Sequence, residues 1–157
     1  MSDIKDPENT LLLDLAHGQV VIELKTDLAP KHVARIKELA REGYYDGVVF
    51  HRVIEGFMAQ GGDPTGTGTS GSGQKIPAEF SDEPHVRGVC SMARTQDPNS
   101  ADSQFFICFG DATFLDGQYT VWGKVASGME YVDKLARGEP PAEPDRIEKM
   151  RVAADAA

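Results

Sequence analysis

The sequence predicts a mainly β protein in which short antiparallel strands close into a barrel and two helices pack against it. Short segments rich in β-branched and aromatic residues recur along the chain, separated by glycine, proline and asparagine turns. Only two segments show the apolar spacing of an amphipathic helix. The sequence lacks the βαβ rhythm of a parallel sheet, which favours an antiparallel barrel.

The N-terminal half begins with a predicted hairpin and a predicted helix. We expect strands over Thr10–Ala16 and Gly18–Leu24, which turn at His17-Gly18. A helix is expected from Pro30 to about Gly43, because proline suits a first helical position and glycine suits the end of a helix. Its apolar stripe consists of Val33, Ile36, Leu39 and Ala40.

The chain is organised around a second hairpin, with strands expected at 49–54 and 57–60. Strict alternation places Phe50, Arg52 and Ile54 on one face. An arginine between two large apolar neighbours is unusual on a core face and unnecessary on a solvent face. The spacing alone leaves open a structural role, in which the arginine stem packs at a barrel rim while its head stays in water.

A glycine-rich stretch, Pro64 to Gly73, follows this hairpin and contains a formal match to the dinucleotide-binding fingerprint at Gly66–Gly71. That fingerprint requires a helix to begin at the glycines, so that the helix N-terminus can hold the pyrophosphate. The residues that follow, Gln74-Lys75-Ile76-Pro77, do not start a helix. We therefore interpret the stretch as a turning loop and expect no nucleotide cofactor.

The C-terminal half supplies the remaining elements. Strands are expected at 89–93, 104–109 and 119–125, and a short helix at 129–137. A last, weakly alternating strand at 146–152 would close the sheet.

Length and composition describe one domain that spans residues 1–157. This length is enough to bury a core without disulfides or metals, and the hydrophobic fraction of 40% is typical of water-soluble proteins. Residues 1–8 are polar and are expected to form a flexible tail without the features of a signal peptide. No stretch reaches the apolar length of a membrane helix. We therefore expect a cytoplasmic protein, and a monomer.

Charge and cysteine content narrow the possible partners. The formal net charge of −9 argues against nucleic acid and against an anionic membrane surface, because both require clustered Lys and Arg. The two cysteines, Cys90 and Cys108, lie in apolar segments. Buried free thiols are therefore expected rather than a disulfide.

The titratable residues do not match common hydrolytic or metal-binding motifs. The four histidines, His17, His32, His51 and His85, do not occur at metal-binding spacing, and no Gly-x-Ser-x-Gly elbow is present in the sequence. We expect neither a metal site nor a covalent nucleophile.

Three ordered blocks of sequence resemble the cyclophilin family of peptidyl-prolyl cis-trans isomerases, and in particular its bacterial cytosolic members. They are Phe-His-Arg-Val-Ile-Glu-Gly-Phe-Met-Ala-Gln-Gly-Gly-Asp at 50–63, Ser-Gln-Phe-Phe-Ile at 103–107 and Phe-Leu-Asp-Gly at 114–117. The resemblance extends from about Thr10 to Val152. It implies a closed eight-stranded antiparallel β-barrel capped by two α-helices. It also implies isomerisation of X-Pro bonds in peptides and in unfolded or folding proteins, without cofactor or metal.

The resemblance also implies which residues act. Amide resonance sets a barrier of roughly 18–20 kcal/mol. In the twisted transition state the prolyl nitrogen regains a lone pair, so a donor aimed at it binds that state selectively. Arg52 is implied as this donor, and Gln60 as the group that holds the substrate backbone. The implied substrate-binding residues are His51, Phe57, Met58, Ala93, Arg94, Thr95, Gln104, Phe106, Phe114, Leu115 and Tyr119.

Periodicity alone does not place all of these residues in one pocket. Alternation puts Phe57 and Met58 on opposite faces, and simple core packing would explain Phe57, Met58 and Phe106 equally well. A non-catalytic module that binds proline-containing peptides, or a holdase-like chaperone, is the rival interpretation. Arg52 argues against this rival, because a pure binder does not need a donor at the prolyl nitrogen.

Three positions depart from the best-known eukaryotic cyclophilin pattern. Phe114 stands where many members have tryptophan, Tyr119 where many have histidine, and Arg94 where many have asparagine. The first change removes the indole N–H that cyclosporin-sensitive members use, so we expect weak cyclosporin binding.

Overall fold

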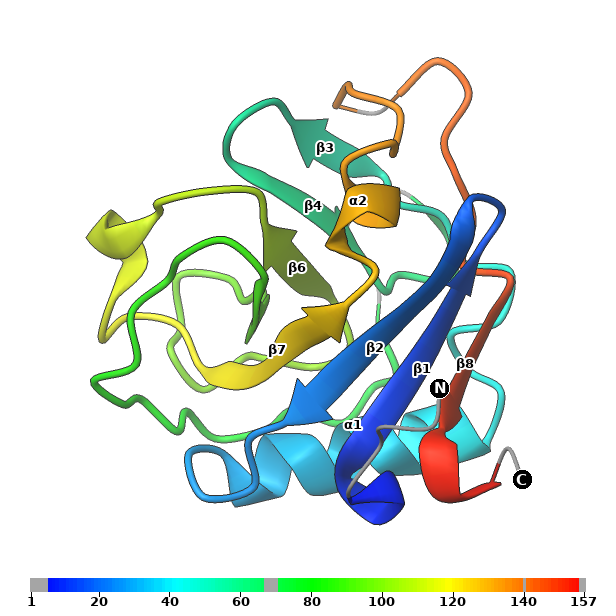
Figure 1. Cartoon of the computed structure of the whole chain (residues 1–157). Helices are drawn as coiled ribbons and strands as arrows, with labels where there is room; N and C mark the ends of the chain where they lie inside the picture. The colour runs from blue at the N-terminus through cyan, green and yellow to red at the C-terminus, as the bar shows by residue number, and fades with distance from the viewer. Residues whose placement is uncertain (1–5, 67–70, 140, 156–157) are drawn as a thin grey trace.

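The structure is a computed structural model, and it describes residues 6–66, 71–139 and 141–155. Eight strands form one antiparallel sheet in the order β3-β4-β6-β5-β7-β2-β1-β8 (Figure 1). The strands are β1 (Thr10–Leu15), β2 (Gly18–Leu24), β3 (Arg52–Ile54), β4 (Met58–Gly61), β5 (Val89–Met92), β6 (Phe105–Cys108), β7 (Val121–Ser127) and β8 (Lys149–Val152). The helices are α1 (Pro30–Arg41) and α2 (Met129–Val132), with short 3-10 helices η1 (Pro7–Asn9), η2 (Thr113–Leu115) and η3 (Ala153–Asp155).

The prediction of a mainly β fold with eight antiparallel strands and two helices is confirmed, but the prediction of a closed barrel is wrong. The sheet is an open half-barrel, since its edge strands β3 and β8 do not pair with each other among the described residues. In the described part of the chain, a few backbone contacts join the segments before these strands, including a bridge between Val49 and Arg146. The Ile147 N–H also donates to the Val48 carbonyl at 2.8 Å. Both edge strands are short, with three residues in β3 and four in β8.

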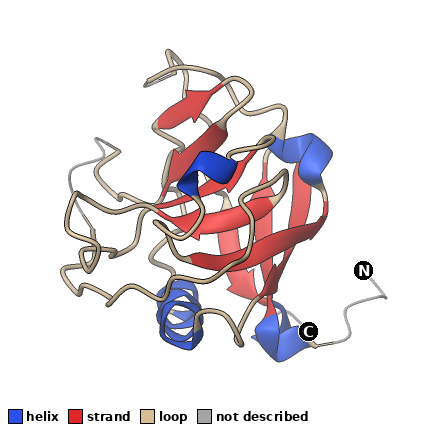
Figure 2. Cartoon of the chain, turned by 90° about the vertical axis from the view of Figure 1, so that its left-hand side faces the viewer, coloured by secondary structure: helices blue, strands red, loops and turns tan. Residues whose placement is uncertain are grey.

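The two helices lie at opposite ends of the sheet, as the views in Figures 1 and 2 agree. Helix α1 begins at Pro30 as predicted and buries its apolar stripe, with His32 buried beside it. Helix α2 ends at Val132, five residues earlier than the predicted Arg137. Beyond it, the Ala136 N–H donates to the Asp145 carboxylate at 2.7 Å instead of continuing the helical ladder.

The central hairpin is shorter than the sequence predicts. Its first strand contains only Arg52–Ile54, and Phe57 belongs to the turn before β4. Alternation therefore does not hold from Phe50 onward. Phe50 is fully buried in the main core, whereas Arg52 is half-buried on the other face, so the prediction that they share a face is wrong.

Apolar side chains gather on both faces of the sheet. The larger cluster includes Phe50, Phe105 and Trp122, which are fully buried. A smaller cluster on the opposite face is built on Met58, Phe106, Cys108 and Val121. The partly buried residues packed against this smaller cluster include Phe57, Ala93, Leu115 and Tyr119. A second apolar face that is only partly covered leaves room for a ligand.

A glycine allows the segment after β4 to pass close to the segment before β6. Gly62 has a φ of +103°, and a Cβ there would overlap the Ser103 carbonyl. The Ser103 hydroxyl donates to the Gly62 carbonyl at 2.7 Å, and the buried Tyr45 hydroxyl donates to the Ser103 carbonyl at 2.9 Å. The positive φ and this close approach account for glycine at position 62.

The chain segments expected to be irregular are described only in part. Residues 1–5 of the expected tail and residues 67–70 of the glycine-rich stretch lie outside the described residues. Within the tail, Pro7–Asn9 form η1, and Glu8 pairs with Arg41 at 3.0 Å. Across the described ranges we find no helix that is long and apolar enough to span a membrane.

Candidate active site

A row of side chains crosses three adjacent strands on the face that carries the smaller cluster. Arg52 on β3 pairs with Gln60 on β4, and Gln60 pairs with Phe106 on β6. Residues directly opposite each other in neighbouring strands point to the same face. The register of the sheet, rather than a loop, therefore sets an arginine, an amide and an aromatic ring side by side.

A pocket of about 130 Å³ opens beside this row. Nine of the predicted site residues line it, of which most are apolar or aromatic and two are arginines. They are Arg52, Phe57, Met58, Gln60, Ala93, Arg94, Phe106, Leu115 and Tyr119. Phe57 and Met58 both reach the pocket because Phe57 precedes the strand and so escapes its alternation.

Arg52 is held between a carboxylate and an amide. Its Nε donates to Oε1 of Glu139 at 2.9 Å, and its Nη1 donates to Oε1 of Gln60 at 3.4 Å. Gln60 in turn donates to Oε1 of Gln104 at 3.0 Å. Glu139 carries no signal in the sequence, because it lies 87 residues from Arg52 in a proline-rich loop.

Arg94 also lines the pocket and is held differently. Its Nε donates to the Gln118 carbonyl at 2.9 Å, and its Nη1 donates to the Thr95 carbonyl at 2.9 Å. The guanidinium lies over the Tyr119 ring, 4.6 Å from the centroid. Tyr119 meets Phe106 edge-on at 5.9 Å, so Arg94, Tyr119 and Phe106 form one continuous wall.

A buried hydrogen-bonded chain supports this wall. His85 is fully buried and its ring stacks on Phe106 at 6.2 Å between centroids. Its Nδ1 lies 2.9 Å from Asp116 Oδ1, and its Nε2 lies 2.9 Å from Ser91 Oγ. The order Asp-His-Ser resembles a hydrolase triad, but Ser91 is fully buried and its hydroxyl also contacts the Thr120 carbonyl at 2.9 Å. A nucleophile must reach its substrate, so we assign this chain a structural role.

Comparison with known proteins decides the family. The model of the cyclophilin-type peptidyl-prolyl cis-trans isomerases matches residues 10–152. A probable peptidyl-prolyl cis-trans isomerase of Brucella suis is 55% identical, over 96% of this chain and 85% of its own length. A peptidyl-prolyl cis-trans isomerase of Synechococcus elongatus is 41% identical over 93% of this chain and 97% of its own length. The chain belongs to the cyclophilin family of peptidyl-prolyl cis-trans isomerases.

Solved structures agree with this assignment. A cyclophilin from Hirschia baltica superposes with a TM-score of 0.89 at 33% identity, covering 97% of this chain and 76% of that one. A Cryptosporidium parvum cyclophilin, crystallised in the presence of the dipeptide Ala-Pro, gives a TM-score of 0.84 at 30% identity. That match covers 91% of this chain and 98% of the Cryptosporidium chain. The resemblance found in the sequence is thus confirmed at the level of family and fold.

Four predicted site residues of this cyclophilin do not line the pocket. Gln104 accepts a hydrogen bond from Gln60, which does line the pocket. Phe114 is 66% exposed, and its ring centroid lies 5.5 Å from that of Phe57. The Thr95 hydroxyl contacts Ser100 at 2.7 Å. His51 is buried, and within the described chain its Nδ1 has no hydrogen-bond partner. Burial lowers the pKa of His51, against an opposing effect of the Asp63 carboxylate, and the nearby Arg52 also lowers it.

The cyclophilin pocket carries neither a reactive thiol nor a metal cluster in the described ranges. Both cysteines are free and buried. Burial raises the pKa of the Cys108 thiol to about 12 and the pKa of Cys90 well above its usual value. The described residues contain no group of three or more His, Cys, Asp or Glu side chains that could hold a metal ion.

Proposed function

We propose that this cyclophilin accelerates rotation about X-Pro bonds by seating the proline ring in the apolar pocket and donating a hydrogen bond from Arg52 to the prolyl nitrogen. The observation that carries the proposal is the position of Arg52. Its guanidinium lines the same pocket as Phe57, Met58, Phe106 and Leu115. A charged donor is thus next to an apolar seat of the size and character that a pyrrolidine ring needs.

The chemistry requires little more than this arrangement. Resonance sets the rotational barrier, and in the twisted amide the nitrogen becomes a better hydrogen-bond acceptor. A donor that pairs only with the twisted form lowers the barrier without tightening ground-state binding. Arginine suits the role because it stays charged and its donors have fixed directions. No covalent bond is made or broken, so neither a nucleophile nor a cofactor is part of the proposed mechanism.

The magnitudes show that Arg52 does not act alone in this proposal. A millionfold acceleration requires roughly 8 kcal/mol. One charge-assisted hydrogen bond supplies about 1.5–3 kcal/mol. The remainder is assigned to fixing the residues that flank proline and to a preorganised, partly dry pocket. Gln60 has two roles in this proposal. It accepts a hydrogen bond from Arg52 Nη1, and it lines the pocket, where it can bond the substrate backbone.

The proposed substrates are proline-containing peptides and the proline sites of unfolded or folding proteins. Support comes from the Cryptosporidium relative, which was crystallised in the presence of Ala-Pro. The resemblance places Ala93, Arg94, Thr95 and Gln104 along the path of the residues before proline. A cytoplasmic, monomeric protein remains our expectation from the sequence.

The test is cis-trans exchange of an Ala-Pro peptide, measured by NMR with wild type and with Arg52→Ala. We expect the wild type to broaden the exchanging resonances and the variant to lose at least tenfold of the catalysed rate. Arg137→Ala is the matched control, since the Arg137 Nε also donates to a glutamate at 2.9 Å but Arg137 is not part of the pocket lining. Binding of the peptide without faster exchange would instead favour a peptide-binding module.

A further inference from the structure

The two guanidinium groups of the pocket differ in how their charge is balanced. Arg52 forms an ion pair with Glu139, with its Nε 2.9 Å from the carboxylate. Arg94 is bonded only to main-chain carbonyls, those of Thr95, Gln96 and Gln118. No ion pair of Arg94 occurs among the described residues. The uncompensated positive charge of the pocket therefore resides on Arg94.

Arg94 is also fixed in place before any ligand arrives. Its carbonyl bonds use Nε and Nη1, at 2.9 Å to Gln118, 2.9 Å to Thr95 and 3.4 Å to Gln96. The plane of the group lies over Tyr119 at 4.6 Å and extends toward Phe80, 6.0 Å away. Fixing a long side chain in advance reduces the entropy lost when a ligand binds it.

One edge of the fixed guanidinium has no protein acceptor. Arginine has five N–H groups, of which Nε holds one and each terminal nitrogen holds two. The bonds to carbonyls account for the donors on Nε and Nη1. The two N–H groups on Nη2 have no acceptor in the described part of the chain. Each of these N–H groups can donate a charge-assisted hydrogen bond to a carboxylate oxygen.

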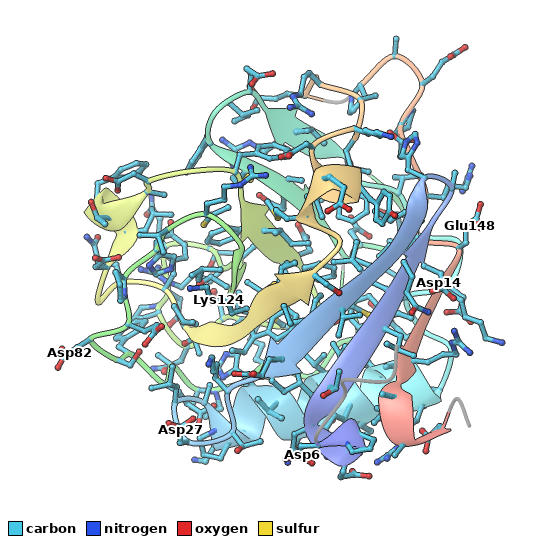
Figure 3. All side chains as sticks on the ribbon, viewed as in Figure 1. Asp6, Asp14, Asp27, Asp82, Lys124 and Glu148 are labelled. Atoms are coloured by element: carbon cyan, nitrogen blue, oxygen red, sulfur yellow. The ribbon has the colours of Figure 1, made fainter. Side chains whose placement is uncertain are left out.

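The positive charge of Arg94 contrasts with the acidic character of the chain as a whole, which would disfavour an acidic ligand. The chain has a formal net charge of −9. Figure 3 shows the acidic side chains Asp6, Asp27, Asp82 and Glu148 at the periphery of the molecule. The overall charge therefore does not attract carboxylates, and we expect any preference for them to come from a nearby cation.

We propose that Arg94 forms a subsite for a carboxylate side chain near the proline, so that this cyclophilin prefers substrates with Asp or Glu at one position beside the X-Pro bond. The proposal rests on the isomerase function proposed above and adds a substrate class to it. Arg94 follows β5, and β5 lies three strands from β3, which carries Arg52. Strands are about 4.8 Å apart, so the backbones that carry the two arginines are separated by about the length of a few residues of extended peptide.

The experiment compares glutamate with glutamine at each of the three positions before and after a central proline in an alanine peptide. For each peptide, NMR exchange gives the catalysed rate relative to the uncatalysed rate. The readout is the ratio of Glu to Gln at each position. We expect a ratio of about two to five at one position or two adjacent positions, the size of a partly exposed ion pair, and ratios at or below about one elsewhere.

Three variants assign the preference. Arg94→Gln should bring the raised ratio to about one, because it removes the charge, and a general loss of rate cancels in the ratio. Arg94→Lys should keep part of it, since the charge remains but the fixed, planar set of donors does not. Lys31→Gln removes the same charge from an exposed site on α1 outside the pocket lining and should leave the ratio unchanged.

The outcomes separate this proposal from the isomerase proposal. Ratios at or below one at every position, or a raised ratio that persists in Arg94→Gln, would overturn the carboxylate subsite while leaving catalysis of the glutamine peptides intact. Absence of catalysis for all peptides, including the glutamine series, would instead overturn the proposed isomerase function.

Discussion

Arg52 and Glu139 form an ion pair at the edge of the pocket, with 2.9 Å between Nε and Oε1. The pair joins the central hairpin to the proline-rich loop after α2. These two segments are far apart in the sequence. Glu139 takes up Nε and leaves the terminal nitrogens, one of which contacts Gln60 at 3.4 Å. In the proposed mechanism, the carboxylate would orient the guanidinium through Nε, and a terminal nitrogen would donate within the pocket.

Replacing Glu139 with glutamine should lower kcat/KM for an Ala-Pro peptide about two- to fivefold, because Arg52 then samples more rotamers and must be ordered at each turnover. Stability should change by less than about 1 kcal/mol, as is usual for exposed ion pairs. NMR exchange and urea unfolding measure the two effects.

A matched control exists for this variant. Glu55 accepts from Arg137 Nε, also at 2.9 Å, and neither residue lines the pocket. Glu55→Gln should therefore leave kcat/KM unchanged. An equal loss in both variants, or no loss in Glu139→Gln, would show that Glu139 does not position Arg52.

The free energy of unfolding should decrease as the pH falls from about 7.5 to 5.5, because two buried histidines resist protonation. Burial lowers the pKa of His32 and of His51. The unfolded chain, with histidine pKa near 6.5, takes up these protons first. Their contribution is fully present above that value and is lost as the pH falls toward the folded pKa. The slope per histidine cannot exceed about 1.4 kcal/mol per pH unit.

Urea unfolding at several pH values measures this slope, and His51→Gln should flatten it by removing one of the two groups. Hydrogen bonds from basic side chains lower the pKa of several carboxyl groups, including Glu8 and Asp133, so these groups titrate at lower pH than the histidines. A stability that is constant or increases from pH 7.5 to 5.5 would contradict the assignment.

Local signals were enough to predict most elements of this fold. The first hairpin and the start of α1 at Pro30 follow from alternation and from proline at a first helical position. The end of α2 was predicted too late, because the Asp145 carboxylate competes for a backbone donor. That competition depends on tertiary structure and leaves no periodic trace in the sequence. Closure of the barrel was also predicted wrongly, because the sequence does not show whether the edge strands β3 and β8 pair with each other.

The candidate site was predictable only with the family resemblance. Alternation marked Arg52 as unusual, because it predicted an arginine between two large apolar residues. It placed Phe57 and Met58 on opposite faces, although both line the pocket. Glu139 and His85 were not predicted, for the same reason. Each contacts a partner that is distant in the sequence, so no short motif or periodic pattern marks the contact. Glu139 reaches Arg52 across 87 residues, and His85 reaches Asp116 across 31.

The cysteines should not react in the native protein. Cys90 packs in the main core and Cys108 in the smaller cluster, so the sheet lies between their side chains and they cannot form a disulfide without backbone movement. Burial raises the pKa of both thiols, which leaves almost no thiolate at pH 8. A thiol reagent such as DTNB should therefore label neither cysteine in buffer and both in concentrated guanidinium chloride. Rapid labelling of the folded protein would contradict this prediction.

Phe114→Trp should strengthen cyclosporin binding from a weak starting affinity. Phe114 lies in η2, is 66% exposed and has its ring 5.5 Å from Phe57 at the pocket lining. Tryptophan would keep the aromatic contact and add an indole N–H, the donor used by cyclosporin-sensitive cyclophilins. A neutral hydrogen bond of about 0.5–1.5 kcal/mol corresponds to a gain of roughly two- to tenfold. Phe80→Trp is the control, because Phe80 is also exposed, at 43%, but is not part of the pocket lining. Calorimetric titration measures both variants; a submicromolar Kd for the wild type, or equal affinities for wild type and Phe114→Trp, would refute the role assigned to this position.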